Sequence, residues 1–328
     1  MPRVSPLLLG AADVAGSAPM LLEIVSLVEA AYRMQASGQA DVPPKIGVHP
    51  GGPQNFLHAM PAWVSGARAL GMKWVALFPG NAARGFPDSS GIVVLNDPDS
   101  GVPVAILEGM WITYARTSAC AALAAKYLVS GTPRRLGLIG CGGLGRWSLR
   151  MIGTLFPTIK EIFVASKRPE SRQSFCAMMA KEGQWQPVPV DDIRSAVEGM
   201  DIVVSSLPKL QQHPVLGRWL SPGTVIIPLD VTGAWDDEVY RKADRIVCDG
   251  TANLQQALER YRPNLAIDPA RMVAMQDLAA GKCLARQAPG DRILAFVTGI
   301  ASLDIVLAWE IYRRAVASGR GLRFDLVV

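Results

Sequence analysis

The sequence has few of the residues that bind metals or form disulfide frameworks. Its 328 residues include only three histidines and five cysteines, and the cysteines stand at irregular spacing with no Cys-x-x-Cys pair. An odd number of irregularly spaced cysteines fits neither a disulfide framework nor a zinc site. We therefore expect no metal site, and we expect the protein to work in a reducing cytoplasm.

Long runs of one charge and long apolar runs are also missing. The formal net charge is +5, from 33 basic and 28 acidic residues spread along the chain, so no basic stripe predicts nucleic-acid binding. The most apolar stretch, ILAFVTGIASLDIVLAW at 293–309, carries Asp304 and is too short to cross a bilayer. We expect neither a membrane nor a nucleic acid among the partners.

What the chain does have is the composition of folded domains. Half of its residues (50%) are hydrophobic and 19% are charged, as in globular proteins. The length is sufficient for two domains that each bury a core of their own.

A glycine-rich segment near the middle of the chain predicts a dinucleotide-binding turn. In LGLIGCGGLGRWSLRMIG (136–153), a strand-type apolar run precedes the glycines and helical spacing follows them. Gly140 permits a tight turn, Gly142 lets a pyrophosphate approach the backbone, and Gly145 lets helix and strand pack closely. The helix N-terminus would present its N–H groups to the phosphates. A glycine-rich turn with a purely structural role is the alternative.

The end of the next predicted strand bears on the choice of dinucleotide. IKEIFVAS (159–166) ends at Ser166 and is followed by Lys167 and Arg168. A site that prefers NAD would place an acidic residue here to bind the ribose 2′-hydroxyl. A hydroxyl and two cations suit a 2′-phosphate instead, so we predict that NADP(H) is preferred and NAD(H) is possible. The alternative is an ordinary basic start of a helix.

The order of the remaining elements predicts an α/β fold. DIVVSSLP (201–208), TVIIPLD (224–230) and RIVCDG (245–250) are typical of parallel strands, with helical segments between them. We predict a doubly wound parallel sheet. Ahead of it, a helix over 20–38, several strand-like runs and a hairpin loop at NDPDSG predict a mixed α/β unit with its own core.

Six segments, spread over almost the whole chain, carry a family resemblance. They are GMKWVALFPGN, GIVVLNDPDSGVPVAILEG, ITYARTSACAALAAKYL, the glycine-rich turn, PVLGRWLSPGT and FVTGIASLDIVLAWEIYRRAVASGRG. Together they resemble the ornithine cyclodeaminase/μ-crystallin family. The resemblance implies a substrate-binding and dimerisation domain formed by residues 1–124 with 303–328, a Rossmann dinucleotide-binding domain over 125–302, and a homodimer.

Two basic residues match the family's substrate-binding positions. Lys73 in GMKWV matches the active-site lysine, and Arg116 in YARTSA matches the carboxylate-binding arginine. A planar guanidinium and an ammonium can hold the carboxylate of an amino or imino acid. A lysine in an apolar strand is costly to bury without an anionic partner. The alternatives are a snorkelling lysine on an edge strand and a surface cation preceding an Ala-rich helix.

Other positions match the family less well. Lys45 stands where the family usually has a second arginine, so it keeps the charge but loses the bidentate fork. His58 in LHAMP replaces the acidic residue of the ornithine-specific members and is poorly suited to hold a distal ammonium. Leu144 replaces the usual glutamine of the turn. The resemblance also assigns Gly143 and Thr117 to the cofactor-binding residues.

Asp230 in PLDVTGAWDDEVY is the best match to the family's catalytic aspartate, although this loop is shorter than the usual pattern. We assign Asp236 and Asp237 to the start of the following helix. Asp230 could accept a proton from a substrate ammonium or position water at an imine carbon. The alternative is a structural aspartate that caps the loop. His49 and His213 receive no role.

These residues lead to an expected function. We expect an NAD(P)H-dependent imine reductase or amino-acid dehydrogenase that transfers hydride at the α-carbon of a small amino or imino acid, and we expect Lys73→Ala to abolish turnover with little change in folding. An ornithine-type cyclodeaminase, which yields a cyclic imino acid and ammonia with NAD(P) as bound cofactor, is one alternative. A non-catalytic NADPH-binding protein resembling μ-crystallin is the other. The side chain of the substrate is not predicted.

Overall fold

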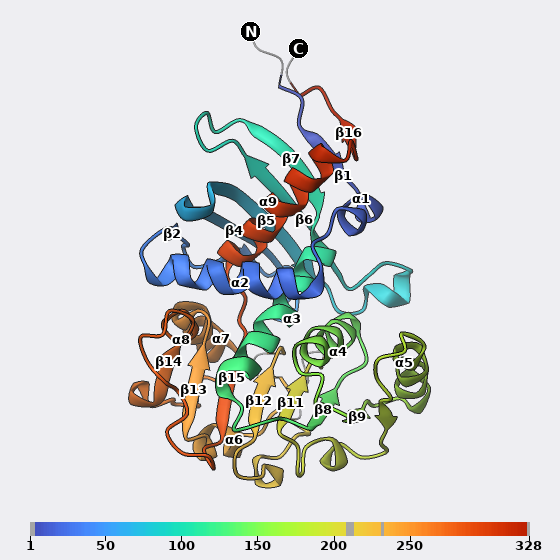
Figure 1. The fold of residues 1–328 in the computed structure, drawn as a ribbon, viewed down its shortest axis with the longest axis vertical. Coiled ribbons are helices and arrows are strands. Elements are labelled where there is room, and N and C mark those ends of the chain that lie inside the picture. Colours follow the sequence, from blue (N-terminus) through green and yellow to red (C-terminus); the bar gives the residue numbers. More distant parts are fainter. Residues whose placement is uncertain (1–3, 208–212, 231–232, 327–328) are drawn as a thin grey trace. The chain divides into compact units, whose positions relative to one another are not determined.

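The computed structural model describes residues 4–207, 213–230 and 233–326. The chain forms two compact units, unit 1 from Met1–Arg116 with Gly299–Val328 and unit 2 from Thr117–Thr298. Each unit contains a β-sheet of its own (Figure 1).

The elements of unit 1 are β1 (Leu7–Leu9), α1 (Ala11–Gly16), α2 (Leu21–Ala36), β2 (Ala40–Asp41), β3 (Ile46–Val48), β4 (Phe56–Val64), β5 (Ala69–Leu77), β6 (Ser89–Asn96), β7 (Pro103–Glu108), α9 (Ala301–Ala317) and β16 (Leu322–Arg323). Helix α3 (Gly109–Leu128) begins in unit 1 and ends in unit 2.

The sheet of unit 1 is mixed. Its strand order is β16-β1-β7-β6-β5-β4-β2, and β3 pairs with β4. Only β1 and β7 are parallel. The predicted helix over 20–38 is α2, and the predicted hairpin joins β6 to β7. Asp97 closes that hairpin, because its Oδ1 accepts hydrogen bonds from the N–H groups of Asp99 and Ser100 at 3.1 and 2.8 Å.

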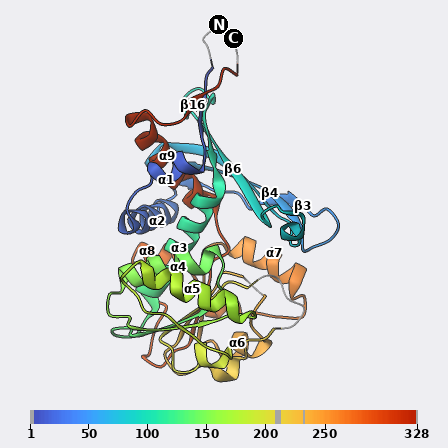
Figure 2. The same ribbon diagram turned by 90° about the vertical axis from the view of Figure 1, so that its right-hand side faces the viewer.

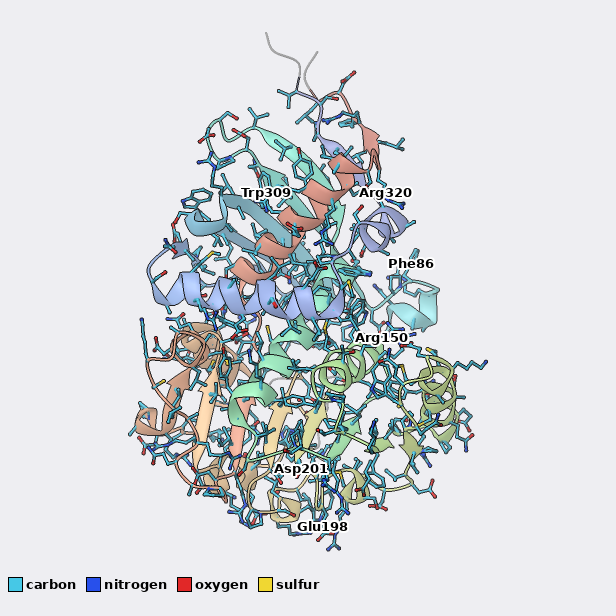
Figure 3. All side chains as sticks on the ribbon, in the orientation of Figure 1. Phe86, Arg150, Glu198, Asp201, Trp309 and Arg320 are labelled. Atoms are coloured by element: carbon cyan, nitrogen blue, oxygen red, sulfur yellow. The ribbon has the colours of Figure 1, made fainter. Side chains whose placement is uncertain are left out.

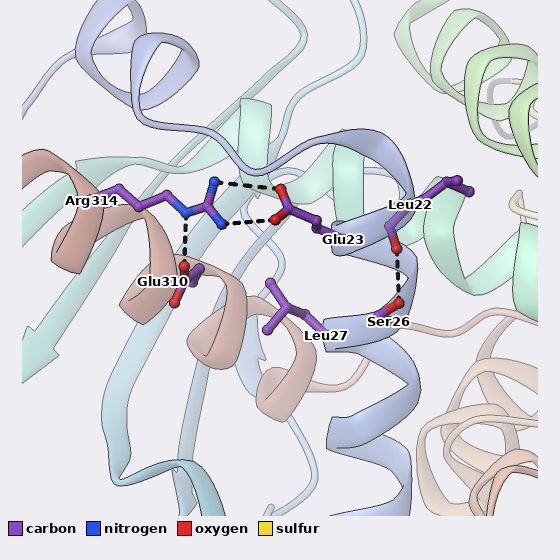
Figure 4. A pocket seen from close by; sticks show the side chains of 6 residues that line it. All are labelled: Leu22, Glu23, Ser26, Leu27, Glu310 and Arg314. Atoms are coloured by element: carbon purple, nitrogen blue, oxygen red, sulfur yellow. Dashed lines mark hydrogen bonds and ion pairs between the residues drawn. The ribbon is translucent and has the colours of Figure 1, made fainter.

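Helix α9 covers one face of this sheet. It packs against β4, β5 and β6, with α2 beside it (Figure 2). Alternate residues are buried from Met60 to Val64 in β4 and from Ala69 to Lys73 in β5, as expected when only one face of a sheet is packed. A groove of about 450 Å³ lies between the two helices, and its acidic and basic side chains pair with one another (Figure 4). The groove is lined by Leu22, Glu23, Ser26, Leu27, Glu310 and Arg314.

The elements of unit 2 after α3 are β8 (Arg135–Ile139), α4 (Gly143–Leu155), β9 (Glu161–Ala165), α5 (Pro169–Lys181), β10 (Val188–Pro189), β11 (Ile202–Ser205), β12 (Val225–Pro228), α6 (Asp237–Lys242), β13 (Arg245–Cys248), α7 (Thr251–Tyr261), β14 (Met272–Ala274), α8 (Met275–Ala279) and β15 (Ile293–Phe296).

The sheet of unit 2 has the predicted doubly wound arrangement. Its order is β10-β9-β8-β11-β12-β15-β13-β14, and all of its strand pairs are parallel. From β8 the chain builds outward first to β9 and β10 and then to β11 and β12. The point where the direction reverses is where such sheets bind ligands, outside the carboxyl ends of the strands. The predicted α/β class with a parallel sheet is confirmed.

Two parts of unit 2 differ from the prediction. Within residues 213–224, which follow β11, the structure has only a 3-10 turn at Gly217–Trp219 where a helix was predicted. Two prolines and two glycines in this stretch disfavour a longer helix. Strand β15 was not predicted, because its four residues begin a longer apolar stretch and periodicity alone does not separate a short buried strand from a helix.

The amino ends of the parallel strands are held by aspartates. Oδ2 of Asp201, which precedes β11, accepts hydrogen bonds from the N–H groups of Arg134 and Arg135 at 2.7 and 2.9 Å (Figure 3). Asp244, which precedes β13, does the same for the N–H of Arg292 at 2.7 Å. These bonds lie at the amino ends of the strands. The glycine-rich turn and the loop of Asp230 lie at the opposite, carboxyl ends of β8 and β12.

In the described ranges, no helix is both long enough and apolar enough to cross a membrane. No group of three or more His, Cys, Asp or Glu side chains in these ranges is arranged to hold a metal ion.

Candidate active site

Lys73 lies in the interior of the unit 1 sheet, and its side chain is shielded from solvent. Strand β5 runs between β4 and β6, where Lys73 pairs with Met60 on one side and Val93 on the other. Its exposed fraction is 1%. A snorkelling lysine on an edge strand is therefore excluded, and the buried charge requires an anionic partner.

That partner is Asp304 in α9. Lys73 Nζ donates a hydrogen bond to Asp304 Oδ1 at 2.9 Å, and Arg116 Nε donates to the same oxygen at 2.8 Å. Lys73 Nζ also lies 3.5 Å from Thr113 Oγ1. Arg116 is 5% exposed and Asp304 is 0% exposed. We call Lys73, Arg116 and Asp304 the buried ion triad; β5, α3 and α9 each supply one member.

Burial and neighbouring charges set the protonation of the triad. Burial first, and then the charge of Arg116, lower the pKa of Lys73 to about 7 against the opposing effect of Asp304. Burial alone would raise the pKa of Asp304, but the charges of Arg116 and Lys73 outweigh it and bring that pKa below its usual value. Asp304 is therefore ionised at neutral pH, and with Lys73 protonated the triad carries one more positive charge than negative.

Arg116 is buried inside a helix, so the alternative of a surface cation preceding an Ala-rich helix does not apply. Helix α3 already begins at Gly109, because the Glu108 carboxylate accepts hydrogen bonds from the N–H groups of Met110 and Trp111 at 2.6 and 2.9 Å. The guanidinium of Arg116 packs against Gly299. A Cβ at Gly299 would come within 2.6 and 2.9 Å of Nη1 and Nη2. This arrangement therefore requires a glycine at position 299.

Lys45 and His58 lie near Lys73 in unit 1. Lys45 directly precedes β3, and its positive charge contributes to lowering the pKa of Lys73. His58 in β4 is two residues from Met60, which pairs with Lys73. Because opposed residues and every second residue of antiparallel strands share a face, His58 lies on the same face of the sheet as Lys73.

The ring of His58 is part of an aromatic cluster. It stacks on Phe56 with ring centroids 4.2 Å apart, and the ring of His49 meets it edge-on at 5.7 Å. Nδ1 of His49 is 2.8 Å from the carbonyl oxygen of Asn55. His49, which had no assigned role, therefore supports His58.

The three glycines of the turn in unit 2 differ in what surrounds them. A Cβ at Gly140 (φ +118°) would lie 2.7 Å from the Ser206 carbonyl oxygen, and one at Gly145 would lie 2.3 Å from the Gly140 carbonyl oxygen. A Cβ at Gly142 would meet no protein atom within 4 Å. Packing therefore requires the first and third glycines but not the second.

The helix after this turn begins without a side-chain cap. Gly142 is the N-cap of α4, which runs on through Gly143 and Leu144, and it offers no side chain to the first N–H groups. Uncapped N–H groups beside open space at Gly142 fit a phosphate group.

The basic residues after β9 fall into two kinds. Lys167 and Arg168 are exposed, and Ser166 Oγ donates a hydrogen bond to the Arg168 carbonyl oxygen at 3.0 Å. Arg172 is instead buried, donates to the Ser166 carbonyl oxygen at 3.1 Å and pairs with Asp191. Arg172 thus supports the strand end, while the other two cations are accessible to solvent.

Asp230 follows β12, and its two carboxylate oxygens differ in their surroundings. Its Oδ2 accepts a hydrogen bond from the Leu207 N–H at 3.1 Å. Its Oδ1 is buried and has no hydrogen-bond partner in the described part of the chain. Burial raises the pKa of Asp230 to about 6. A carboxyl group of this kind can accept or donate a proton near neutral pH. Residues 231–232 of the same loop lie outside the described residues.

Other predicted residues of unit 2 have structural surroundings. Asp236 caps α6 by accepting a hydrogen bond from the Val239 N–H at 3.3 Å, so its assignment to the helix start is confirmed. Thr117 is buried in α3 at 6% exposure. Nδ1 of His213 is 2.9 Å from the Gly233 carbonyl oxygen, so this histidine ties two loops together.

Sequence reasoning missed Asp304, Thr113 and Gly299. Asp304 had been used only as an argument against a membrane span, although a lone acid inside an apolar stretch is also a signal for a buried cation. Thr113 gave a weaker signal, because it precedes Arg116 by three residues and so shares its side of a helix. Gly299 gave no signal in the sequence. A glycine is needed there because of the guanidinium of Arg116, which is far away along the chain.

Comparison with known proteins identifies the family. The model of the ornithine cyclodeaminase/mu-crystallin family matches residues 4–319. The chain belongs to this family. Among its relatives is a nodulation efficiency protein, NfeD, of Rhizobium meliloti, which is 28% identical over 302 residues covering 90% of this chain and 91% of the relative.

Two solved structures of the family share this fold closely. The Δ1-pyrroline-2-carboxylate reductase of Thermococcus litoralis, in complex with NADH and L-proline, is 26% identical with a TM-score of 0.88, covering 96% of this chain and 99% of its own. An archaeal alanine dehydrogenase dimer with bound NAD is 28% identical, also with a TM-score of 0.88, covering 98% and 100%.

Proposed function

We propose that this family member is an NAD(P)H-dependent imine reductase or amino-acid dehydrogenase that acts on a small amino or imino acid. The observation that carries the proposal is the buried ion triad, in which two cations share a single carboxylate oxygen. Their excess positive charge suits a second carboxylate, that of the substrate. The reductase that binds NADH and L-proline and the alanine dehydrogenase that binds NAD support this reading.

Each unit has a role in this proposal. Unit 1 would be the substrate-binding and dimerisation domain, which the sequence placed at 1–124 with 303–328, and unit 2 the Rossmann dinucleotide-binding domain, which it placed at 125–302; the units of the structure instead divide after Arg116 and after Thr298. Lys73 and Arg116 hold the substrate carboxylate, Lys45 adds positive charge, and His58 contacts the rest of the substrate. The site orients the α-carbon for hydride transfer, which gains rate chiefly from positioning.

The cofactor fits the glycine-rich turn. Gly140, Gly142, Gly143, Leu144 and Gly145 would hold its pyrophosphate, because the space at Gly142 is open and α4 begins without a cap. Thr117 is assigned to the same site from the family resemblance. When bound, the nicotinamide supplies or accepts hydride at the α-carbon of the substrate.

Asp230 would handle the proton. In the direction of reduction it donates a proton to the substrate nitrogen, and in the direction of oxidation it accepts one. Its pKa of about 6 keeps both protonation states populated near neutral pH.

The preference for NADP(H) over NAD(H) rests on Ser166, Lys167 and Arg168. Arg168→Ala should raise the KM for NADPH by about 10-fold and leave that for NADH nearly unchanged, because only NADPH carries the 2′-phosphate. Lys181→Ala, at the exposed far end of α5, is the matched control. Equal effects of Arg168→Ala on both cofactors would contradict the preference.

The cyclodeaminase alternative shares the hydride step and differs in the distal pocket. His58 and its aromatic neighbours offer no carboxylate to a distal ammonium, which disfavours it. A non-catalytic binding protein is disfavoured by Asp230, whose carboxyl group titrates near neutral pH.

An activity screen separates these functions. The protein is assayed with Δ1-pyrroline-2-carboxylate and with linear 2-imino acids formed from 2-oxo acids and ammonia, each with NADPH and NADH. Reduction of any of them supports the proposal. Conversion of L-ornithine to proline and ammonia with catalytic amounts of cofactor would favour the cyclodeaminase. Tight cofactor binding without turnover of any substrate would favour the binding protein.

A cytoplasmic homodimer is also part of the proposal. Trp74 and Ile92 are cross-strand neighbours that are 40% and 41% exposed on the face of the unit 1 sheet opposite Lys73. Ile46 and Val48 of β3 are 69% and 58% exposed. A second copy would cover such apolar side chains, and the archaeal alanine dehydrogenase is a dimer. Sedimentation of the wild type as a monomer would contradict this.

A further inference from the structure

Asp304 differs from Glu310, the other acid of α9, in being fully buried together with two buried cationic partners. Its Oδ1 accepts hydrogen bonds from Lys73 Nζ and Arg116 Nε, and the exposed fractions of these two side chains are 1% and 6%. Its Oδ2 is buried and has no hydrogen-bond partner among the described residues. One oxygen atom thus holds two cations that come from different elements.

The bond to Nε fixes the orientation of the Arg116 guanidinium. A guanidinium is planar, so holding Nε at 2.8 Å sets the plane in which Nη1 and Nη2 lie. The guanidinium also packs closely against Gly299, so closely that a Cβ at this position would overlap Nη1 and Nη2. Nη1 and Nη2 are the donor pair that a substrate carboxylate would use in a bidentate contact.

The charge of Asp304 keeps the proton on Lys73. The charged groups that act on the Lys73 ammonium are Asp304 from α9, Arg116 from α3 and Lys45 ahead of β3. Asp304 is the only acid among these three. Without it, burial and two like charges would all favour the neutral amine, which binds a carboxylate weakly.

The fold needs an acid at this place only because Lys73 and Arg116 are buried beside it. Replacing a buried ion cluster by apolar side chains is often neutral or stabilising. The neighbours of Asp304 in α9, Leu303 and Ile305, are fully buried apolar residues. An acid in this apolar setting therefore points to a role in the site.

We propose that Asp304 is the positioning residue of the carboxylate site: it fixes the plane of the Arg116 guanidinium and holds Lys73 as the ammonium. This inference rests on the proposed function, in which Lys73 and Arg116 bind the substrate carboxylate. Asp304 does not itself contact the substrate in this proposal.

The test compares Asp304→Asn with Glu310→Gln. Both variants change an acid of α9 to its amide, but Glu310 binds Arg314 at the groove between α2 and α9 (Figure 4). The substrate probe is Δ1-pyrroline-2-carboxylate. In Asp304→Asn, kcat/KM should fall by about 10- to 100-fold, the range known for residues that orient ligand-binding groups. Most of this loss should appear in KM for the imino acid, with KM for the nicotinamide cofactor unchanged. Glu310→Gln should match the wild type.

The pH profile separates positioning from a purely structural role. Carboxylate binding needs protonated Lys73, so it is present at low pH and lost as pH rises through the pKa of Lys73, about 7 in the wild type. In Asp304→Asn this loss should occur at lower pH. A structural role would change the unfolding temperature without moving the profile.

Each outcome bears on one claim. A wild type that reduces no imino acid contradicts the proposed function. An active wild type with an unchanged KM and pH profile in Asp304→Asn overturns the role of Asp304. If Asp304→Asn does not fold, Asp304→Glu replaces it. Asp304→Glu should raise KM but keep the wild-type pH profile, because it keeps the charge and moves the carboxylate; an unchanged KM there also overturns the inference.

Discussion

Asp304 of unit 1 and Asp230 of unit 2 are two shielded carboxyl groups with opposite properties. Asp304 binds two cations, and its pKa lies below the usual value. In Asp230 one oxygen has no hydrogen-bond partner among the described residues, and burial raises the pKa to about 6. Burial acts in the same direction on both, so the partner charges decide the outcome.

The same contrast extends to the surroundings of the two groups. In unit 1 Asp304 binds both Lys73 and Arg116 and offsets one of their two positive charges, and Gly299 packs directly against the guanidinium. In unit 2 the N-terminus of α4 has no side-chain cap, and Gly142 has no protein atom near it. One unit holds its polar groups in fixed contacts, and the other leaves polar groups exposed to a ligand.

The largest effect is expected for Asp230→Asn. Loss of a general acid–base group should lower kcat by about 10²- to 10⁴-fold. The same change should stabilise the fold at pH 7. Because the folded pKa of about 6 is above the unfolded value near 4, the stability contributed by Asp230 falls as pH rises from about 4 to about 6. Asparagine does not ionise, so Asp230→Asn should have a free energy of unfolding at pH 7 that is higher than that of the wild type by as much as about 3 kcal/mol.

Urea unfolding at pH 5 and pH 7 measures that difference between Asp230→Asn and the wild type. Asp201→Asn is the control, since Asp201 receives hydrogen bonds at the opposite edge of the same sheet. A variant that is destabilised at pH 7, or one that keeps the wild-type kcat, would contradict the assignment of Asp230.

The next effect is expected for Lys73→Met, which leaves Asp304 with Arg116 alone. Asp304 and Arg116 remain as a pair of balanced charge, and burial already disfavours the Lys73 ammonium by lowering its pKa to about 7, so the free energy of unfolding at pH 7 should not fall. Activity should fall by about 10²- to 10³-fold, as expected for loss of a buried charge contact to the substrate.

Calorimetry and steady-state kinetics follow the two effects of Lys73→Met. Lys126→Met is the control, because Lys126 is an exposed lysine of α3. If Lys73→Met keeps the wild-type KM for the imino acid, Lys73 does not bind the substrate carboxylate.

A smaller effect is expected for Gly142→Ala in unit 2. The new Cβ meets no protein atom within 4 Å, so stability should change by no more than about 1 kcal/mol. Cofactor affinity should fall by about 10-fold, because the methyl group would occupy the space proposed for the pyrophosphate. Titration of NADH fluorescence measures this change. Gly145→Ala should instead disrupt folding, since its Cβ would lie 2.3 Å from the Gly140 carbonyl oxygen. Unchanged NADH affinity in Gly142→Ala would place the cofactor elsewhere.

The smallest effect is expected for Gly299→Ala in unit 1. Its Cβ would displace the Arg116 guanidinium, so KM for the imino acid should rise by about 3- to 10-fold, a cost of roughly 1 kcal/mol in binding. Gly319→Ala is the matched control. It has a similar positive φ (+65° against +79°), and its Cβ would meet nothing within 4 Å. Both variants carry the backbone strain, and only Gly299→Ala should alter KM.

The sequence predicted features that depend on neighbours in the chain. The strand–turn–helix around Gly140 and Gly145, the hairpin at Asp97 and the start of α6 at Asp236 are set by residues a few positions apart, and the structure has all of them. The need of Lys73 for an anionic partner was also predictable, because the residues next to it in the strand are apolar. Features set by local chemistry were predictable.

Features that depend on distant residues were not predicted. The anion proved to be Asp304, which is 231 residues from Lys73 and meets it only because α9 packs on β5. Gly299 and Arg116 are likewise far apart in the sequence, and their contact exists only in the folded chain. The start of α3 at Gly109 was not predicted, because the capping by Glu108 was not recognised. Strand β15 became recognisable only from its pairing with β12 and β13.

The internal counter-ion of Lys73 has a consequence for how the protein is made. Because Asp304 belongs to the same polypeptide, a newly synthesised chain can enclose its lysine and arginine without waiting for a small acid from the cell. Asp304 follows Arg116 by 188 residues, so these cations stay uncompensated on the ribosome until α9 emerges. Shortened chains that stop before α9 would lack this neutralising group and should be short-lived in the cell.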